Sequence, residues 1–298
     1  MKIALIHNPN AFRGETEGSD LRRIFKRAGH DLIYASTKQS DWQIILSQEI
    51  ALAIIAGGDG TVQEVAPHLK GTPFSILPCG TANNIAQCLQ QTPNAELLAS
   101  QLNQAHLCPL DVGTVMYGLE NRRFLEGTGI GAFVELILVM RNRSKKIKMK
   151  QAKSRTEKFA HALERLQAIG REYEGVRVKL KADDTVIEDR FILMAAMNME
   201  LIGPRLHLAP NADPADGYLD LVLVREKHRE SFCRWLECQI PGQKKAADLE
   251  RRRCRRVEMS WTGVAPIHID SHLVRKPQFP ILIETEPTAL EYAIVKPP

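Results

Sequence analysis

Residues 51–61 read Ala51-Leu52-Ala53-Ile54-Ile55-Ala56-Gly57-Gly58-Asp59-Gly60-Thr61. The six apolar residues suit a central β-strand that is covered on both faces. The glycines behind it permit positive φ and leave no Cβ in the way of an approaching ligand. A helix that begins at this point offers free backbone N–H groups to an anion. The segment therefore predicts a strand–turn–helix unit that cradles phosphate, although a tight structural turn would also fit the last five residues.

A second glycine turn follows the next predicted strand. Pro73–Leu77 is apolar apart from Ser75, and Pro78-Cys79-Gly80-Thr81 comes directly after it. Carboxyl ends of parallel strands meet at one edge of the sheet, which is where open α/β sheets bind ligands. Two such turns at one edge favour a binding role over incidental structure. Neither turn has the ending of a Walker A loop or the spacing of the dinucleotide fingerprint.

The remaining pattern divides the chain into two halves. Strand and helix signals alternate over the first 130 residues, which predicts a doubly wound parallel α/β sheet. Later residues form strand-like runs, with a hairpin at Asp183-Asp184 and one inserted helix over 154–169, which predicts an antiparallel β-sandwich or barrel. We predict an α/β nucleotide-binding domain over 1–125 and a β-sandwich substrate domain over 126–285. A C-terminal segment, 286–298, can return to the first domain.

Composition indicates a globular protein of the reduced cytosol. The chain has 298 residues, 44% of them apolar and 25% charged, and no apolar run long enough to span a membrane. It begins without the pattern of a secretory signal, and its six cysteines show no CxxC pair or metal-type spacing. A cytoplasmic location is therefore expected. The three tryptophans show no stacking pattern with the basic residues, so nucleic acid is not favoured as a partner.

Basic residues gather in two places, within 141–153 and within 251–256, although the net charge is only +5. Such clusters attract polyanions, among them an anionic membrane surface. A solvated helix face is the alternative for either cluster.

Several motifs resemble the diacylglycerol kinase catalytic-domain family, which includes bacterial lipid kinases, sphingosine kinases and ceramide kinases. The resemblance rests on Asn8-Pro9, the Gly57–Thr61 turn and the Pro78–Asn83 turn, followed by Gly127–Gly131 and by Asp216–Leu221. It runs in order from Asn8 to Asp270. NAD kinases share the first glycine turn, but the second turn does not suit them.

The resemblance implies that ATP lies across the glycine turns and that a lipid hydroxyl enters a cleft between the domains. The residues that it places at ATP are Asn8, Thr37, Gly57, Gly58, Asp59, Gly60, Thr61, Val62, Gln63, Gly80 and Thr81. Asp59 would either orient a Mg²⁺ ion or take part in proton transfer.

The resemblance also implies a structural Mg²⁺ site at Asp216, with Asp213 and Tyr218 as further contributors, although Asp-Gly is a favoured turn dipeptide as well. Family members commonly carry Asp-Gly-Glu near the C-terminus, where this chain has Asp270-Ser271-His272. Asp270, or His272 in place of the glutamate, would accept the proton of the lipid hydroxyl. Asn84 is a second departure, since bacterial relatives often have Asp there.

We therefore expect an ATP- and Mg²⁺-dependent lipid kinase of phospholipid metabolism. It would be cytoplasmic and would reach an anionic membrane surface through its basic patches. Two alternatives remain open: a nucleotide-binding sensor or scaffold that has lost its chemistry, and a kinase for a soluble hydroxyl substrate.

Overall fold

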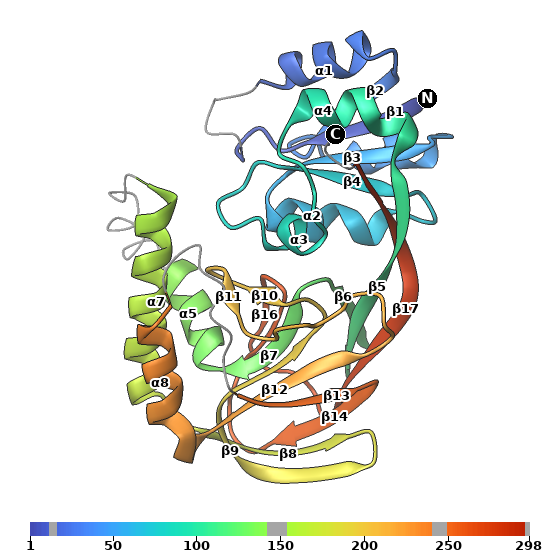
Figure 1. Ribbon diagram of the computed structural model, residues 1–298. Helices are drawn as coiled ribbons and strands as arrows, with labels where there is room; N and C mark the ends of the chain where they lie inside the picture. Colours follow the sequence, from blue (N-terminus) through green and yellow to red (C-terminus); the bar gives the residue numbers. More distant parts are fainter. Residues whose placement is uncertain (12–16, 142–153, 240–248, 296–298) are drawn as a thin grey trace. The chain divides into compact units, whose positions relative to one another are not determined.

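The computed structural model describes residues 1–11, 17–141, 154–239 and 249–295 (Figure 1). The chain forms two compact units, the first of Met1–Leu110 with Thr288–Pro298 and the second of Asp111–Pro287. Strand β5 (His106–Tyr117) carries the chain out of the first unit, and β17 (Ile281–Ile294) brings it back. None of the described helices is long and apolar enough to cross a membrane.

The first unit contains a parallel sheet. Its strands are β1 (Lys2–His7), β2 (Asp31–Ser36), β3 (Leu52–Gly57) and β4 (Phe74–Pro78), in the order β4-β3-β1-β2. All neighbouring pairs are parallel, and the last part of β17 adds a parallel strand beside β4 through Tyr292 and Phe74. Strand β3 is buried along its whole length, as its apolar run requires. The predicted doubly wound α/β fold is confirmed.

Helices cover both faces of this sheet (Figure 1). Helices α1 (Gly18–Arg27) and α4 (Ala95–Gln101) share one face and one apolar core, whereas α2 (Asp59–Val65) and α3 (Asn84–Cys88) lie on the other. Short 3₁₀ turns complete the unit: η1 (Trp42–Ser47), η2 (Ala66–His68) and η3 (Leu102–Gln104). The sequence predicts a helix that opens near Ser40-Asp41, and the structure has the 3₁₀ turn η1 there. The sequence also predicts a helix over 81–89, but this helix begins only at Asn84, because Asn83 is left-handed with φ of 53°.

The second unit is antiparallel. Its strands are β6 (Glu120–Phe124), β7 (Gly127–Gly131), β8 (Val176–Ala182), β9 (Thr185–Met197), β12 (Leu219–Arg225), β13 (Glu250–Cys254), β14 (Arg256–Trp261), β15 (Ile267–Ile269) and β16 (His272–Val274). The long strand β9 pairs with β7, β8 and β12. A separate small hairpin joins β10 (Leu201–Ile202) to β11 (Leu206–His207). The predicted antiparallel sandwich and the β8–β9 hairpin are confirmed.

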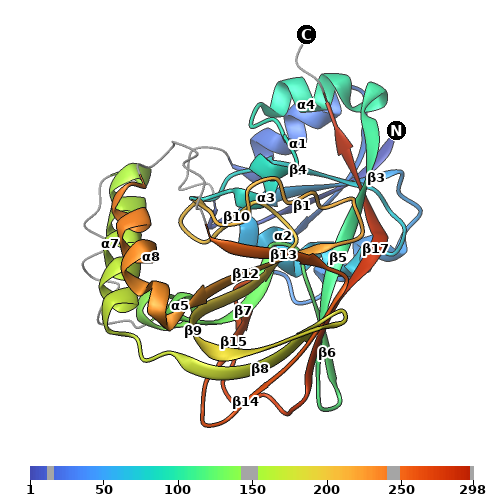
Figure 2. The same cartoon turned by 60° about the horizontal axis from the view of Figure 1, so that its bottom comes forward.

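Three of the described helices pack on one face of this antiparallel sheet: α5 (Ala132–Arg141), α7 (Arg155–Glu172) and α8 (Arg229–Glu237), the last preceded by η4 (Glu226–His228). Figure 2 shows α7 and α8 side by side. Apolar side chains of all three helices share a core with Ile192 on β9 and Val222 on β12. The preceding residue on each strand, Phe191 or Leu221, enters a second core. Alternation along β9 and β12 thus fills a core on each face. Only α7 was expected from the sequence.

Candidate functional site

The two glycine turns lie in direct contact at the carboxyl edge of β3 and β4. A Cβ on Gly80 would stand 2.5 Å from the Cα of Gly58, and one on Gly58 would stand 2.8 Å from the Cα of Gly80. The backbone N–H of Cys79 also donates to the carbonyl of Gly57 at 2.8 Å. No side chain larger than hydrogen fits between the turns, so both glycines are needed for the two loops to meet.

Asp59 connects the two turns. It is the first residue of α2, and its Oδ1 accepts a hydrogen bond from the N–H of Ile85 at the start of α3, at 3.0 Å. Asn83, just before α3, accepts from the N–H of Gly80 at 2.8 Å. Burial raises the pKa of the Asp59 carboxyl, and backbone donors beginning with Ile85 oppose that rise. A carboxylate with a raised pKa is a better proton acceptor near neutral pH.

Asn8 and Thr61 lie beside the first turn. The side-chain amide of Asn8 donates to Oγ1 of Thr61 at 2.9 Å, and the backbone N–H of Asn8 donates to the carbonyl of Ala56. Thr61 is buried, with its side chain beneath Gly57. Thr37 follows β2 and donates its N–H to the carbonyl of His7 at 3.0 Å. These residues therefore share the edge of the sheet that carries the glycine turns.

The other predicted nucleotide residues differ in what they expose. Gly60 and Thr81 are exposed on the two turns, and Gln63 is half-buried. The Val62 side chain is only 1% exposed and belongs to the core, so its side chain is not available to a ligand. The predicted nucleotide residues thus lie at one edge of the sheet. The side chain of Val62 packs in the core beneath that edge.

Sequence reasoning missed an aromatic group near this edge. The hydroxyl of Tyr34 on β2 lies 3.0 Å from Nδ1 of His7, and the guanidinium of Arg22 lies 4.8 Å from the centre of the Tyr34 ring. Burial lowers the pKa of His7, which keeps the imidazole neutral at neutral pH. No motif marks this group, because its members come from separate elements with ordinary spacing.

Asp270 is held by backbone donors. Its carboxylate accepts hydrogen bonds from the N–H groups of Leu125, Glu126 and Gly127, at 2.8, 2.8 and 3.1 Å. The residue itself is left-handed, with φ of 47°, and its own N–H donates to the carbonyl of Gly127. These bonds use lone pairs that a general base would need. The geometry therefore favours a positioning role for Asp270 over the predicted proton transfer.

His272 opens β16 and is exposed. Partial burial and the positive charges of Arg122 and Arg141 lower the pKa of its imidazole. Arg141 also donates to the carbonyl of Ser271. A neutral imidazole can accept a proton at pH 7, so His272 keeps the chemistry that the sequence predicted for it.

The predicted metal ligands lie together in the turn before β12. Asp216 accepts the N–H of Tyr218 on Oδ1 at 2.9 Å, and its Oδ2 pairs with the guanidinium of Arg253 at 2.6 Å. Asp213 accepts the N–H of Ala215 on Oδ1 at 3.0 Å. Among the described residues, no three His, Cys, Asp or Glu side chains form a group that could hold a metal ion. Because Oδ2 of Asp216 is already paired with the Arg253 guanidinium, the turn in this arrangement does not fit Mg²⁺.

Most of the second basic cluster is paired within the chain. Arg252 pairs with Glu250, Arg256 pairs with Glu284, and Arg251 donates to a backbone carbonyl. The first cluster, apart from Arg141, lies outside the described residues. Arginines that already have acceptors contribute less to an anion-binding surface than their number suggests.

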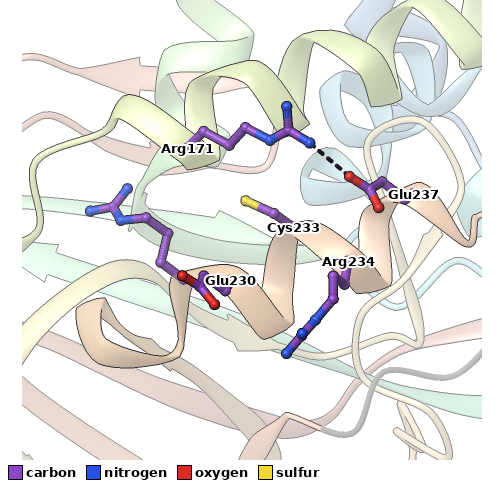
Figure 3. A pocket seen from close by; sticks show the side chains of 6 residues that line it. Arg171, Glu230, Cys233, Arg234 and Glu237 are labelled. Carbon is purple, nitrogen blue, oxygen red and sulfur yellow. Dashed lines mark hydrogen bonds and ion pairs between the residues drawn. The ribbon is translucent and has the colours of Figure 1, made fainter.

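A cavity of about 410 Å³ lies along α7 and α8 (Figure 3) and holds none of the predicted site residues; its lining is Arg171, Arg229, Glu230, Cys233, Arg234 and Glu237. Arg171 and Glu237 form an ion pair at 2.7 Å across it. Burial raises the pKa of the Cys233 thiol, which disfavours the nucleophilic thiolate. The cavity therefore lacks the features of a catalytic centre.

Comparisons with known proteins match both halves of the chain to family models. Residues 2–115 match the family model of the diacylglycerol kinase catalytic domain, and residues 143–294 match that of the YegS C-terminal NAD kinase beta sandwich-like domain. A diacylglycerol kinase of Bacillus subtilis (strain 168) is 24% identical over 256 residues, which cover 81% of this chain and 80% of that protein. A diacylglycerol kinase of Staphylococcus carnosus (strain TM300) is 24% identical over 242 residues, covering 76% and 73%.

The fold has a close counterpart among solved structures. A crystal structure described as that of a diacylglycerol kinase from Bacillus anthracis str. Sterne superposes with a TM-score of 0.72 at 22% identity and covers 99% of this chain and 97% of that one. The two family models together account for nearly the whole chain. The chain therefore belongs to the diacylglycerol kinase catalytic-domain family of lipid kinases.

Proposed function

We propose that this protein transfers the γ-phosphoryl group of ATP to the hydroxyl of a diacylglycerol- or sphingosine-like lipid. The observation that carries the proposal is the contact between Gly58 and Gly80 with Asp59 bridging both turns. This arrangement leaves backbone N–H groups and a carboxylate at the ligand-binding edge of the parallel sheet. The proposal draws further support from relatives that are named diacylglycerol kinases.

ATP phosphates would lie on the glycine turns, where no Cβ limits their approach. Asn8, Thr37 and Thr81 would contribute an amide and two hydroxyls from neighbouring strand ends. A Mg²⁺ ion that enters with the nucleotide would neutralise charge on the transferred group. Phosphoryl transfer needs little covalent help from a protein, so orientation and charge stabilisation supply most of the rate.

The reaction also needs an acceptor for one proton. The lipid oxygen forms a bond to the γ-phosphorus, the bond to the bridging oxygen of ADP breaks, and the hydroxyl proton passes to the protein. Asp59 is the first candidate, because burial raises the pKa of its carboxyl and makes it more basic. His272 is the second, since its imidazole is neutral at pH 7. Asp270 is the third; its carboxylate, like that of Asp59, accepts backbone hydrogen bonds, in its case from three N–H groups.

The proposal is tested by incubating the full chain with ATP labelled in the γ-phosphate and with vesicles of diacylglycerol, sphingosine or ceramide. Label should enter a lipid with the wild type and with Glu96→Gln, which changes an exposed carboxylate on α4. Asp59→Asn should reduce transfer by about 10²–10⁴-fold. If no lipid acquires label while a soluble alcohol such as glycerol does, the lipid assignment is wrong.

A nucleotide-binding sensor or scaffold is the second candidate. It is favoured by one observation, the engagement of Asp270 with the backbone where relatives are expected to keep a base. Binding of ATP without transfer to any acceptor would support it. The same vesicles also test membrane association: equal partition onto anionic and neutral vesicles would argue against a role for the basic patches.

A further inference from the structure

A positively charged side chain of the protein itself, that of Arg253 on β13, lies at the turn before β12. Strands β12 and β13 pair in antiparallel register, with Asp220 opposite Arg253. From this position the guanidinium of Arg253 reaches Oδ2 of Asp216 at 2.6 Å. The strand pairing therefore fixes the backbone of Arg253, and the ion pair fixes its guanidinium.

Aromatic stacking holds the guanidinium from a second side. Its central carbon lies 4.4 Å from the ring centre of Tyr218, and that of Arg255 lies 4.8 Å from the same centre. Cations at such distances are attracted to the ring face. Tyr218 is in turn tied to Asp216, because its N–H donates to Oδ1. Asp216, Tyr218 and Arg253 thus form a closed set of contacts.

The backbone of the same turn is also satisfied within the chain. Gly217, which is left-handed with φ of 75°, donates its N–H to Oδ2 of the buried Asp111 at 2.6 Å. The N–H of Asp111 donates to the carbonyl of Pro214, also at 2.6 Å. The turn therefore has donors for its carboxylates and acceptors for its N–H groups without an added ion.

A divalent cation at Asp216 would compete with the guanidinium for the same carboxylate and would be repelled by its charge. We propose that Arg253 takes the place of the divalent cation that the family resemblance predicts at Asp213, Asp216 and Tyr218, so that the turn forms without metal. The proposal concerns this turn alone. It is independent of the kinase reaction, whose Mg²⁺ would enter with ATP.

The first experiment follows thermal unfolding of the full chain without nucleotide, in EDTA, Mg²⁺ or Ca²⁺. The wild type should unfold at the same temperature in all three. Arg253→Met keeps an apolar stem and removes the charge, so it should unfold on the order of 2–4 °C lower in EDTA. Mg²⁺ or Ca²⁺ should restore that loss, because Oδ2 of Asp216 is then open to a hard cation.

Arg252→Met is the matched control. Arg252 is the neighbouring residue on β13 and pairs with Glu250 on its own strand, so its loss should create no response to metal. An increase in the wild-type unfolding temperature with Mg²⁺ or Ca²⁺ would overturn the proposal. So would an Arg253→Met protein that unfolds like the wild type and ignores metal, since the pair would then be an ordinary surface ion pair.

A calorimetric titration of the wild type with Mn²⁺, again without nucleotide, decides the question if Arg253→Met does not fold. Absence of a binding isotherm supports the proposal, and a site with stoichiometry near one overturns it. Neither readout depends on catalysis, so a failure of the lipid kinase proposal would leave this test unaffected.

Discussion

Oδ1 of Asp59 accepts a hydrogen bond from the backbone N–H of Ile85 at 3.0 Å, which joins the start of α2 to the start of α3. One carboxylate therefore has a structural partner and a place at the ligand-binding edge of the sheet. Any substitution of Asp59 affects both roles. A side chain that keeps an oxygen acceptor but loses the negative charge separates the structural role from the chemical one.

Asp59→Asn should preserve folding and remove activity. The amide oxygen can still accept from Ile85, whereas the amide can neither take a proton nor neutralise a cation. We expect the rate of lipid phosphorylation to fall by about 10²–10⁴-fold, with the unfolding temperature changed little. Steady-state rates and thermal unfolding on the same preparation check this, with Glu96→Gln as the control.

The pH profile gives an independent measure of the same group. Because burial raises the pKa of Asp59, its carboxylate protonates at a higher pH than an ordinary aspartate. Activity that requires the ionised form should rise with pH through that pKa and be lost on acidification. An acid limb that survives in the residual activity of Asp59→Asn would assign the titration to another group.

Gly80→Ala should destabilise the first unit. Its Cβ would stand 2.5 Å from the Cα of Gly58 and 2.7 Å from Oδ1 of Asn83, so the two turns must move apart. Overpacking of this kind costs about 1–3 kcal/mol in the free energy of unfolding. ATP affinity should fall as well, which equilibrium binding of a fluorescent ATP analogue would show.

Gly60→Ala is the matched comparison for stability. No heavy atom lies within 4 Å of a Cβ at Gly60, which is in α2 on the first turn. Because alanine favours the helix and restricts the unfolded chain, stability should stay equal or rise by up to about 1 kcal/mol. Equal losses for the two alanine variants in urea denaturation would contradict the close contact between the turns.

Asp270→Ala should lower the free energy of unfolding, because Asp270 has a structural role. It leaves the N–H groups of Leu125, Glu126 and Gly127 without their acceptor, and each buried donor left unpaired costs about 1–3 kcal/mol. Asp184→Ala is the control, because Asp184 is exposed in the β8–β9 turn. A fully stable but inactive Asp270→Ala protein would restore the catalytic role predicted from the sequence.

The contrast between Asp59 and Asp270 shows what the sequence could predict. The apolar run of β3 and the two glycine turns are local patterns, and parallel topology then places both turns at one edge. The partners of Asp270 lie up to 145 residues away, at backbone groups that carry no side-chain signal. Its residue type indicated acid–base chemistry, but the direction of its carboxylate depends on tertiary structure.

Two elements of secondary structure were not predicted from the sequence for similar reasons. Helix α8 buries only Phe232, Cys233 and Leu236 among charged neighbours, too few apolar positions to stand out by periodicity. The sequence predicts two strands, over 280–284 and 292–295, where the structure has the single strand β17, which continues through Pro287 and a left-handed Thr288. Pairing with β14 in the second unit and with β4 in the first keeps it continuous.

His268 should make the protein sensitive to acid. It is buried on β15, with Nδ1 3.1 Å from the carbonyl of Asp270 and its ring against Phe133, and burial lowers its pKa to about 4. In the unfolded chain a histidine titrates near 6.5. Between these values the unfolded state binds a proton that the folded state does not. Stability contributed by the neutral form is therefore complete above pH 6.5 and is lost as pH falls towards 4, by about 3 kcal/mol in total.

His268→Gln removes this titration, so its free energy of unfolding should fall less between pH 7.5 and pH 4.5 than that of the wild type, even if the variant is less stable at pH 7.5. Urea denaturation at a series of pH values measures the slope. His228→Gln changes an exposed histidine of the same unit and should keep the wild-type slope. Carboxylates that protonate over this range are common to all three proteins and cancel in the comparison. Parallel slopes for the wild type and His268→Gln would mean that His268 is not the buried neutral group that limits stability in acid.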